Sequence, residues 1–80
     1  MDRVDINAKV IAIVARILKI SKETIKGDAT IESLGADSLN RVQYVMELEE
    51  AFGIEINDED AEKLLTVDQT VEYIQRHTVS

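Results

Sequence analysis

The 80-residue sequence contains no cysteine, no proline and no tryptophan. The lack of cysteine excludes a disulfide scaffold, a thiolate metal site and a cysteine nucleophile. Aromatic side chains are limited to Tyr44, Phe52 and Tyr73, so the core must consist mainly of aliphatic residues. Because 45% of the residues are nevertheless hydrophobic, the composition is that of a folded domain and not of a disordered chain.

Long hydrophobic runs are also missing. The longest extends from Val10 to Ala15, far below the roughly 20 residues that a membrane span needs. The first ten residues have neither a signal-peptide nor a transit-peptide pattern. We therefore expect a cytoplasmic protein without a membrane span, folded as a single domain over residues 1–80.

Positive charge is almost absent from the middle of the chain. Residues 28–62 carry eleven acids and a single base, Arg41, whereas residues 1–27 carry six bases and three acids, and the whole chain has a net charge of −7. Such an anionic field repels phosphates and argues against nucleic-acid binding. It favours protein partners with basic surfaces, although solubility alone would also explain it.

Apolar residues recur with helical spacing in four segments, and we predict an all-α fold. The expected helices cover Val4–Lys19, Ser38–Phe52, Asp58–Leu64 and Val67–His77. Between the first two lies a long loop over residues 21–35, with Ile25, Ile31 and Leu34 as its contacts to the core. Ile54-Glu55-Ile56 is too short to predict a strand. The prediction is a small bundle of three main helices and one short helix.

Helix ends carry recognisable signals. Gly53 suits the end of the second helix, and Thr66 with Gln69 fits a capping box before the fourth. At the start of the second helix, a capping box that begins at Ser38 needs Glu or Gln at position 41, where the sequence has Arg41. A box that begins at Asp37 needs Glu or Gln at position 40, where the sequence has Asn40. We therefore expect no capping box there, and two candidate caps.

Ser38 has two interpretations from its local sequence. It can cap the helix, or, if Asp37 is the cap, it is an exposed hydroxyl where backbone N–H groups and the helix dipole favour a phosphate. Composition and spacing leave both open.

Other chemistry finds little support. His77 suits the last turn of a helix, where a cation complements the dipole. The acids around Asp58 lack the ligand spacing of a calcium loop, so no specific metal site is expected. G-A-D-S-L is not the G-x-S-x-G of a hydrolase elbow, and no base partner for Ser38 is evident.

The pattern G-A-D-S-L followed by V-x-x-V-M-x-L-E-E-x-F resembles the acyl carrier protein family. The resemblance extends over nearly the whole chain, through A-F-G-I-E-I, N-D-E-D-A-E-K and the closing T-V-x-x-x-V-x-Y-I. A chain that begins at Met1 is similar to the discrete carriers of fatty acid synthesis. The resemblance implies a non-catalytic, monomeric carrier of acyl thioesters on a 4′-phosphopantetheine arm, with Ser38 as its attachment site.

The same resemblance implies roles for other residues. A phosphopantetheinyl transferase would recognise Asp37 and Leu39, and fatty-acid synthase enzymes with basic patches would dock on the second helix. The implied docking residues are Leu39, Val42, Met46, Glu47, Glu49 and Glu50. The implied acyl pocket consists of Val42, Tyr44, Val45, Leu48, Ile56, Ala61 and Leu64.

The sequence also departs from the family pattern. Asn40 and Gln43 stand where acids are usual, and Arg41 adds a cation beside them. Tyr44 replaces a common leucine, and Asn57 a common proline. The cargo is not specified, so a carrier for another acyl or aminoacyl pathway and an acidic helical adaptor remain alternatives.

Overall fold

The computed structural model describes residues 2–78. Its helices are α1 (Arg3–Leu18), the 3₁₀-helix η1 (Lys22–Thr24), α2 (Ser38–Phe52), α3 (Asp58–Ala61) and α4 (Val67–Thr78). Among these residues there is no β-strand, and one isolated bridge pairs Thr30 with Thr66. The predicted bundle of three main helices and one short helix is confirmed, as is the long loop between α1 and α2.

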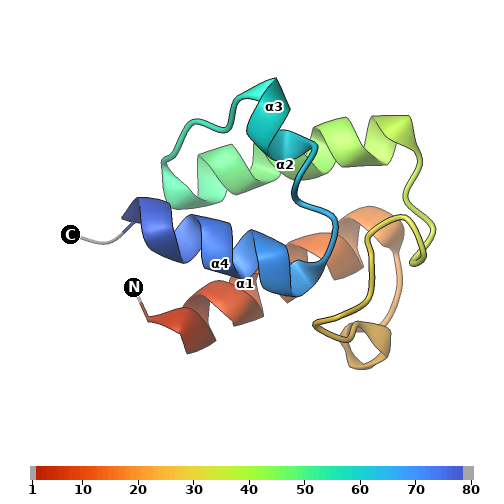
Figure 1. Cartoon of the computed structure of the whole chain (residues 1–80). Coiled ribbons are helices and arrows are strands. Elements are labelled where there is room, and N and C mark those ends of the chain that lie inside the picture. Colours follow the sequence, from red (N-terminus) through yellow and green to blue (C-terminus); the bar gives the residue numbers. More distant parts are fainter. Residues whose placement is uncertain (1, 79–80) are drawn as a thin grey trace.

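Helix α1 packs against both α2 and α4 (Figure 1). In the orientation of the figure, α1 runs from left to right, and α2 and α4 both run back. The long loop lies at the right-hand end of the bundle, and α3 lies above α2. The start of α2 is therefore at the loop end of the molecule.

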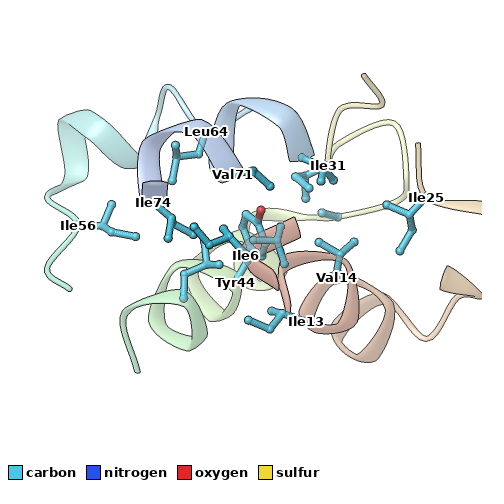
Figure 2. Packing of buried hydrophobic residues seen from close by; sticks show 14 residues of the cluster. Ile6, Ile13, Val14, Ile25, Ile31, Tyr44, Ile56, Leu64, Val71 and Ile74 are labelled. Carbon is cyan, nitrogen blue, oxygen red and sulfur yellow. The ribbon is translucent and has the colours of Figure 1, made fainter. Parts of the chain in front are cut away.

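The core consists of aliphatic side chains from the helices and the loop (Figure 2). Helix α1 contributes one face at 3.6-residue spacing, as the sequence predicted. Ile25 and Ile31 of the loop are buried, and Leu34 packs against the core, which confirms the predicted contacts. The buried hydrophobic residues are Ile6, Val10, Ile13, Val14, Ile25, Ile31, Ala36, Tyr44, Leu48, Ile56, Leu64, Val67, Val71 and Ile74.

Backbone hydrogen bonds tie the long loop to the start of α4. The N–H of Ile31 donates to the carbonyl of Leu65 at 2.8 Å, and that of Asp68 donates to the carbonyl of Gly27 at 2.9 Å. Because the middle of the loop is held at these two points, the segment that leads into α2 starts from a fixed position.

Helix α1 begins one residue before its predicted start, at Arg3, and the C-terminal ends of three helices differ slightly from the prediction. Helix α1 ends at Leu18 because Lys19 takes the left-handed conformation, and α4 extends one residue further, to Thr78. Helix α3 ends at Ala61 and not at Leu64. There the amides of Lys63 and Leu64 bond to carbonyls three residues earlier, and this tighter turn directs Leu64 into the core.

The start of α4 has the predicted capping box. The amide of Gln69 donates to Thr66 Oγ1, and the amide of Thr66 donates to Gln69 Oε1, each at 3.0 Å. Two of the unpaired N–H groups at this helix start are thereby satisfied.

Candidate functional site at the start of helix α2

Residues 35–38 lead into α2 and place Ser38 in contact with solvent. Gly35 has a φ of 106°, a conformation that favours glycine, and turns the chain out of the loop. Ala36 is buried, and its amide donates to the carbonyl of Ile31 at 3.2 Å. Because Ala36 is held against the core, Asp37 and Ser38 follow on the outside, where both are exposed.

Asp37 is the cap of α2, and it has a capping box. The amide of Asn40 donates to Asp37 Oδ1 at 2.8 Å, and the amide of Asp37 donates to Asn40 Oδ1 at 3.2 Å. The expectation of no box at this helix start was wrong, because the asparagine side chain, although shorter than that of glutamine, reaches the cap amide. Capping therefore does not require Ser38.

The hydroxyl of Ser38 is exposed and makes no hydrogen bond within residues 2–78. Ser38 is the first residue of the helix, and the first turn contains no acidic side chain. The N-terminus of a 15-residue helix carries partial positive charge and unpaired N–H groups, which stabilise an anion. A phosphodiester attached here would meet favourable electrostatics, and Arg41 adds a cation three residues further along.

Three apolar side chains remain exposed along α2. Leu39, Val42 and Met46 have exposed fractions of 75%, 57% and 61%, and we call them the docking patch. A row of exposed apolar side chains on one helix is unusual in a small soluble domain, and patches of this kind are common at interaction sites.

The three glutamates predicted beside the docking patch have different surroundings. Glu47 forms an ion pair with Arg16 of α1. Glu49 Oε2 accepts a hydrogen bond of 2.9 Å from the amide of Ile56. Glu50 is exposed and, in the part of the chain described, makes no hydrogen bond or ion pair. Two of the three carboxylates are thus engaged within the fold, and Glu50 is available to a partner.

A groove with an open volume of about 640 Å³ separates α2 from α3 and begins at Ser38. Arg41 spans it, donating through Nη2 to the carbonyl of Ala61 at 3.5 Å. The groove is lined by Ser38, Arg41, Val42, Val45, Met46, Glu49, Ile56, Asp58, Ala61 and Glu62.

The predicted acyl-pocket residues separate into two groups. Val42, Val45, Ile56 and Ala61 line the groove between α2 and α3. Tyr44, Leu48 and Leu64 lie in the core beneath it, each no more than 3% exposed. Ile56 belongs to both groups, since it lines the groove and is buried, and it connects the groove with the core.

Tyr44 makes a polar contact inside this core that sequence reasoning did not find. Its hydroxyl donates to Thr70 Oγ1 of α4 at 2.8 Å, and Thr70 donates in turn to the carbonyl of Thr66 at 3.0 Å. Thr70 is fully buried, and burial raises the pKa of the Tyr44 hydroxyl above its ordinary value, so it remains a neutral donor. A contact across 26 residues leaves no local sequence signal.

The remaining candidates do not form a site. His77 lies in the last turn of α4, where its Nδ1 contacts the carbonyl of Tyr73 at 2.8 Å, as a helix-end histidine should. Over residues 2–78, no group of three metal-ligating side chains is present. Nor does any described helix have the length and apolarity to cross a bilayer.

Comparison with known proteins gives matches over nearly the whole chain. A family model described as a phosphopantetheine attachment site matches residues 8–74. An acyl carrier protein from Rubrobacter xylanophilus is 46% identical over 78 residues, which are 96% of each chain. A solved structure of the acyl carrier protein from Enterococcus faecalis superimposes with a TM-score of 0.79 at 40% identity, covering 92% of this chain and 95% of that one.

Proposed function

The chain belongs to the acyl carrier protein family, and from this premise we propose that Ser38 carries the 4′-phosphopantetheine arm on which the family holds its cargo. The arm's terminal thiol supplies the chemistry, because it holds acyl groups as thioesters. The chain's own part is to expose one serine, to stabilise the phosphodiester and to present the cargo to enzymes of fatty acid synthesis.

One observation carries this proposal: the exposed hydroxyl of Ser38 has no hydrogen bond within residues 2–78 and stands at the N-terminus of α2, at the end of a groove. The hydrogen bonds of the capping box run between Asp37 and Asn40, so a modification at Ser38 breaks neither of them. The dipole of α2 and the guanidinium of Arg41 both favour a phosphodiester at this position.

Partner recognition would use the exposed face of α2. Asp37 and Leu39 flank Ser38 and are the proposed contacts of the phosphopantetheinyl transferase. The docking patch supplies apolar area, and Glu50, with the field of the acidic central segment, would attract synthase enzymes that have basic patches. Glu47 and Glu49 would contribute only after giving up their intramolecular contacts.

The carried acyl chain would shelter between α2 and α3. Val42, Val45, Ile56 and Ala61 offer an apolar lining directly beside Ser38, and the core beneath is aliphatic. We propose that the chain itself catalyses nothing, acts as a cytoplasmic monomer, and is acted on by successive enzymes.

The experiment is an intact-mass measurement. The unmodified protein is incubated with coenzyme A and a broad-range phosphopantetheinyl transferase and then weighed. The wild type should gain the mass of one arm, and Ser38→Ala should gain none, because the acceptor hydroxyl is gone.

Ser33→Ala is the matched control, since Ser33 is another exposed serine and lies five positions earlier, in a turn of the loop. It should be loaded like the wild type. A folded wild type without mass gain, or a Ser38→Ala variant that is still loaded, would refute the assignment and favour an acidic adaptor. If the arm-bearing protein accepted aminoacyl groups but not fatty acyl groups from the corresponding enzymes, the result would instead support a carrier of another pathway.

A further inference from the structure

The hydrogen-bonded pair Tyr44–Thr70 crosses the middle of the core. Tyr44 comes from α2 and Thr70 from α4, and their hydroxyls lie 2.8 Å apart. Tyr44 is 3% exposed and Thr70 is fully buried. Among the described residues, no buried side-chain nitrogen or oxygen lacks a hydrogen-bond partner, so the pair is a satisfied polar element in aliphatic surroundings.

The pair divides the core into two parts. Figure 2 shows the Tyr44 hydroxyl at the centre, with Ile56, Leu64 and Ile74 on one side and Val14, Ile25 and Ile31 on the other. The first part adjoins the groove between α2 and α3, because Ile56 lines that groove. The second part lies beneath the long loop, where Tyr44, Val14 and Ile31 surround a gap too small to hold water.

We propose that the Tyr44–Thr70 pair limits how deep an acyl chain can enter, and so determines the chain length that this protein shelters. The proposal rests on the function proposed above. A chain that enters from the groove would fill the part of the core around Ile56, Leu64 and Ile74. To reach the part beneath the loop it would have to pass between α2 and α4 at Tyr44.

The chemistry of the pair makes it an effective limit. Passing it separates two hydroxyls that no water can reach, and an unpaired buried hydroxyl is strongly unfavourable. Before this point each buried methylene favours the sheltered state by roughly fourfold. Beyond the pair, additional methylenes do not favour the buried state until their burial offsets the lost hydrogen bond. The fraction of buried acyl chain should therefore increase with chain length up to the pair and then stay constant.

The test uses the loaded protein with butyryl, hexanoyl, octanoyl, decanoyl and dodecanoyl groups, each confirmed by intact mass. Two quantities are measured: the melting temperature relative to the unacylated arm-bearing form of the same variant, and the rate of thioester cleavage by hydroxylamine. Because each variant is compared with its own unacylated form, its loss of stability cancels.

Tyr44→Leu removes the barrier, and Thr70→Val breaks the hydrogen bond while retaining a well-packed side chain. The matched control is Thr78→Val, because Thr78 also donates to the carbonyl four residues earlier in α4 but does not contact Tyr44. Thr70→Val keeps the test available if Tyr44→Leu does not fold.

In the wild type and Thr78→Val, both quantities should level off before dodecanoyl. In Tyr44→Leu and Thr70→Val they should continue to change. At roughly fourfold per methylene, two more buried methylenes make cleavage of the dodecanoyl form about fifteenfold slower than in the wild type. The same length profile in all four proteins would overturn the proposal while leaving Ser38 as the attachment site. Failure to load any arm would overturn both.

Discussion

Asp37 and Asn40 are the residues on which the start of α2 depends. Each accepts a hydrogen bond from the backbone of the other, and together they satisfy two amides. Asp37→Ala should lower the free energy of unfolding by about 1 kcal/mol, and Asn40→Ala by about half of that, because only the reciprocal bond is lost. Urea denaturation of the unmodified protein measures both changes.

Gln43→Ala is the control for these two substitutions, because Gln43 is exposed on the same helix and its side chain makes no hydrogen bond in the described structure. Its effect should stay within a few tenths of a kcal/mol. Equal losses for Gln43→Ala and Asp37→Ala would show that the cap does not stabilise α2.

Single residues were predictable where their role depends on the local sequence. Gly53 followed from the end of an apolar pattern. For Ser38 the local sequence left a cap and an exposed hydroxyl open, and the structure decides between them because Asp37 is the cap. The hydrogen bond from the Asp37 amide to the Asn40 side chain was not predicted, because the known motif has the longer Glu or Gln at this position. Whether a shorter side chain reaches the amide depends on the distance between them, which the sequence does not give. The partnership of Tyr44 with Thr70 depends on how α2 and α4 cross, which no local pattern records.

At the scale of elements, the stability of α3 comes from side-chain contacts with the rest of the fold, because the helix is too short to be stable by itself. A four-residue helix has little intrinsic stability, and Glu49 fixes the segment that leads into it through the amide of Ile56. Glu49→Ala leaves that amide without its acceptor. We expect the amide hydrogens of residues 56–61 to exchange with solvent at least about tenfold faster. They exchange through a local opening, whose free energy is lower than that of global unfolding.

Glu50→Ala is the matched control, because Glu50 is the neighbouring residue and touches no backbone amide in the described chain. It should leave exchange in α3 unchanged and slow association with a basic transferase, since only the field of an exposed charge is lost. Slower association with Glu49→Ala but unchanged exchange would mean that Glu49 acts as a docking residue and not as a support for α3.

The helices themselves were largely predictable, since periodic apolar spacing places both ends of α2 and the start of α4 correctly. The end of α3 was not. Its predicted continuation to Leu64 follows the local spacing, but burial of Leu64 requires the tighter turn that ends the helix. Tertiary packing overrode the local pattern at the shortest α-helix, where the local signal is weakest.

At the scale of the whole molecule, the acidic charge has two opposite consequences. Residues 28–62 carry a net charge of −10 and include α2, α3 and the groove between them. A field of this sign would draw molecules with basic surfaces toward α2 and α3. The same charges repel one another in the folded state, so the fold carries an electrostatic strain.

This strain predicts a salt dependence of stability. Between 0.01 M and 0.15 M ionic strength the Debye length falls from ~30 Å to ~8 Å, which screens repulsion across a molecule of this size. The melting temperature should therefore rise by several degrees in calorimetry over that range.

Glu55→Gln, which removes one exposed acid from the central segment, should reduce the rise. Glu23→Gln, in the basic segment before it, should not reduce it, because there the acid is surrounded by an excess of cations. A melting temperature that does not change with salt, or an equal reduction by both substitutions, would show that the concentrated charge of residues 28–62 does not strain the fold.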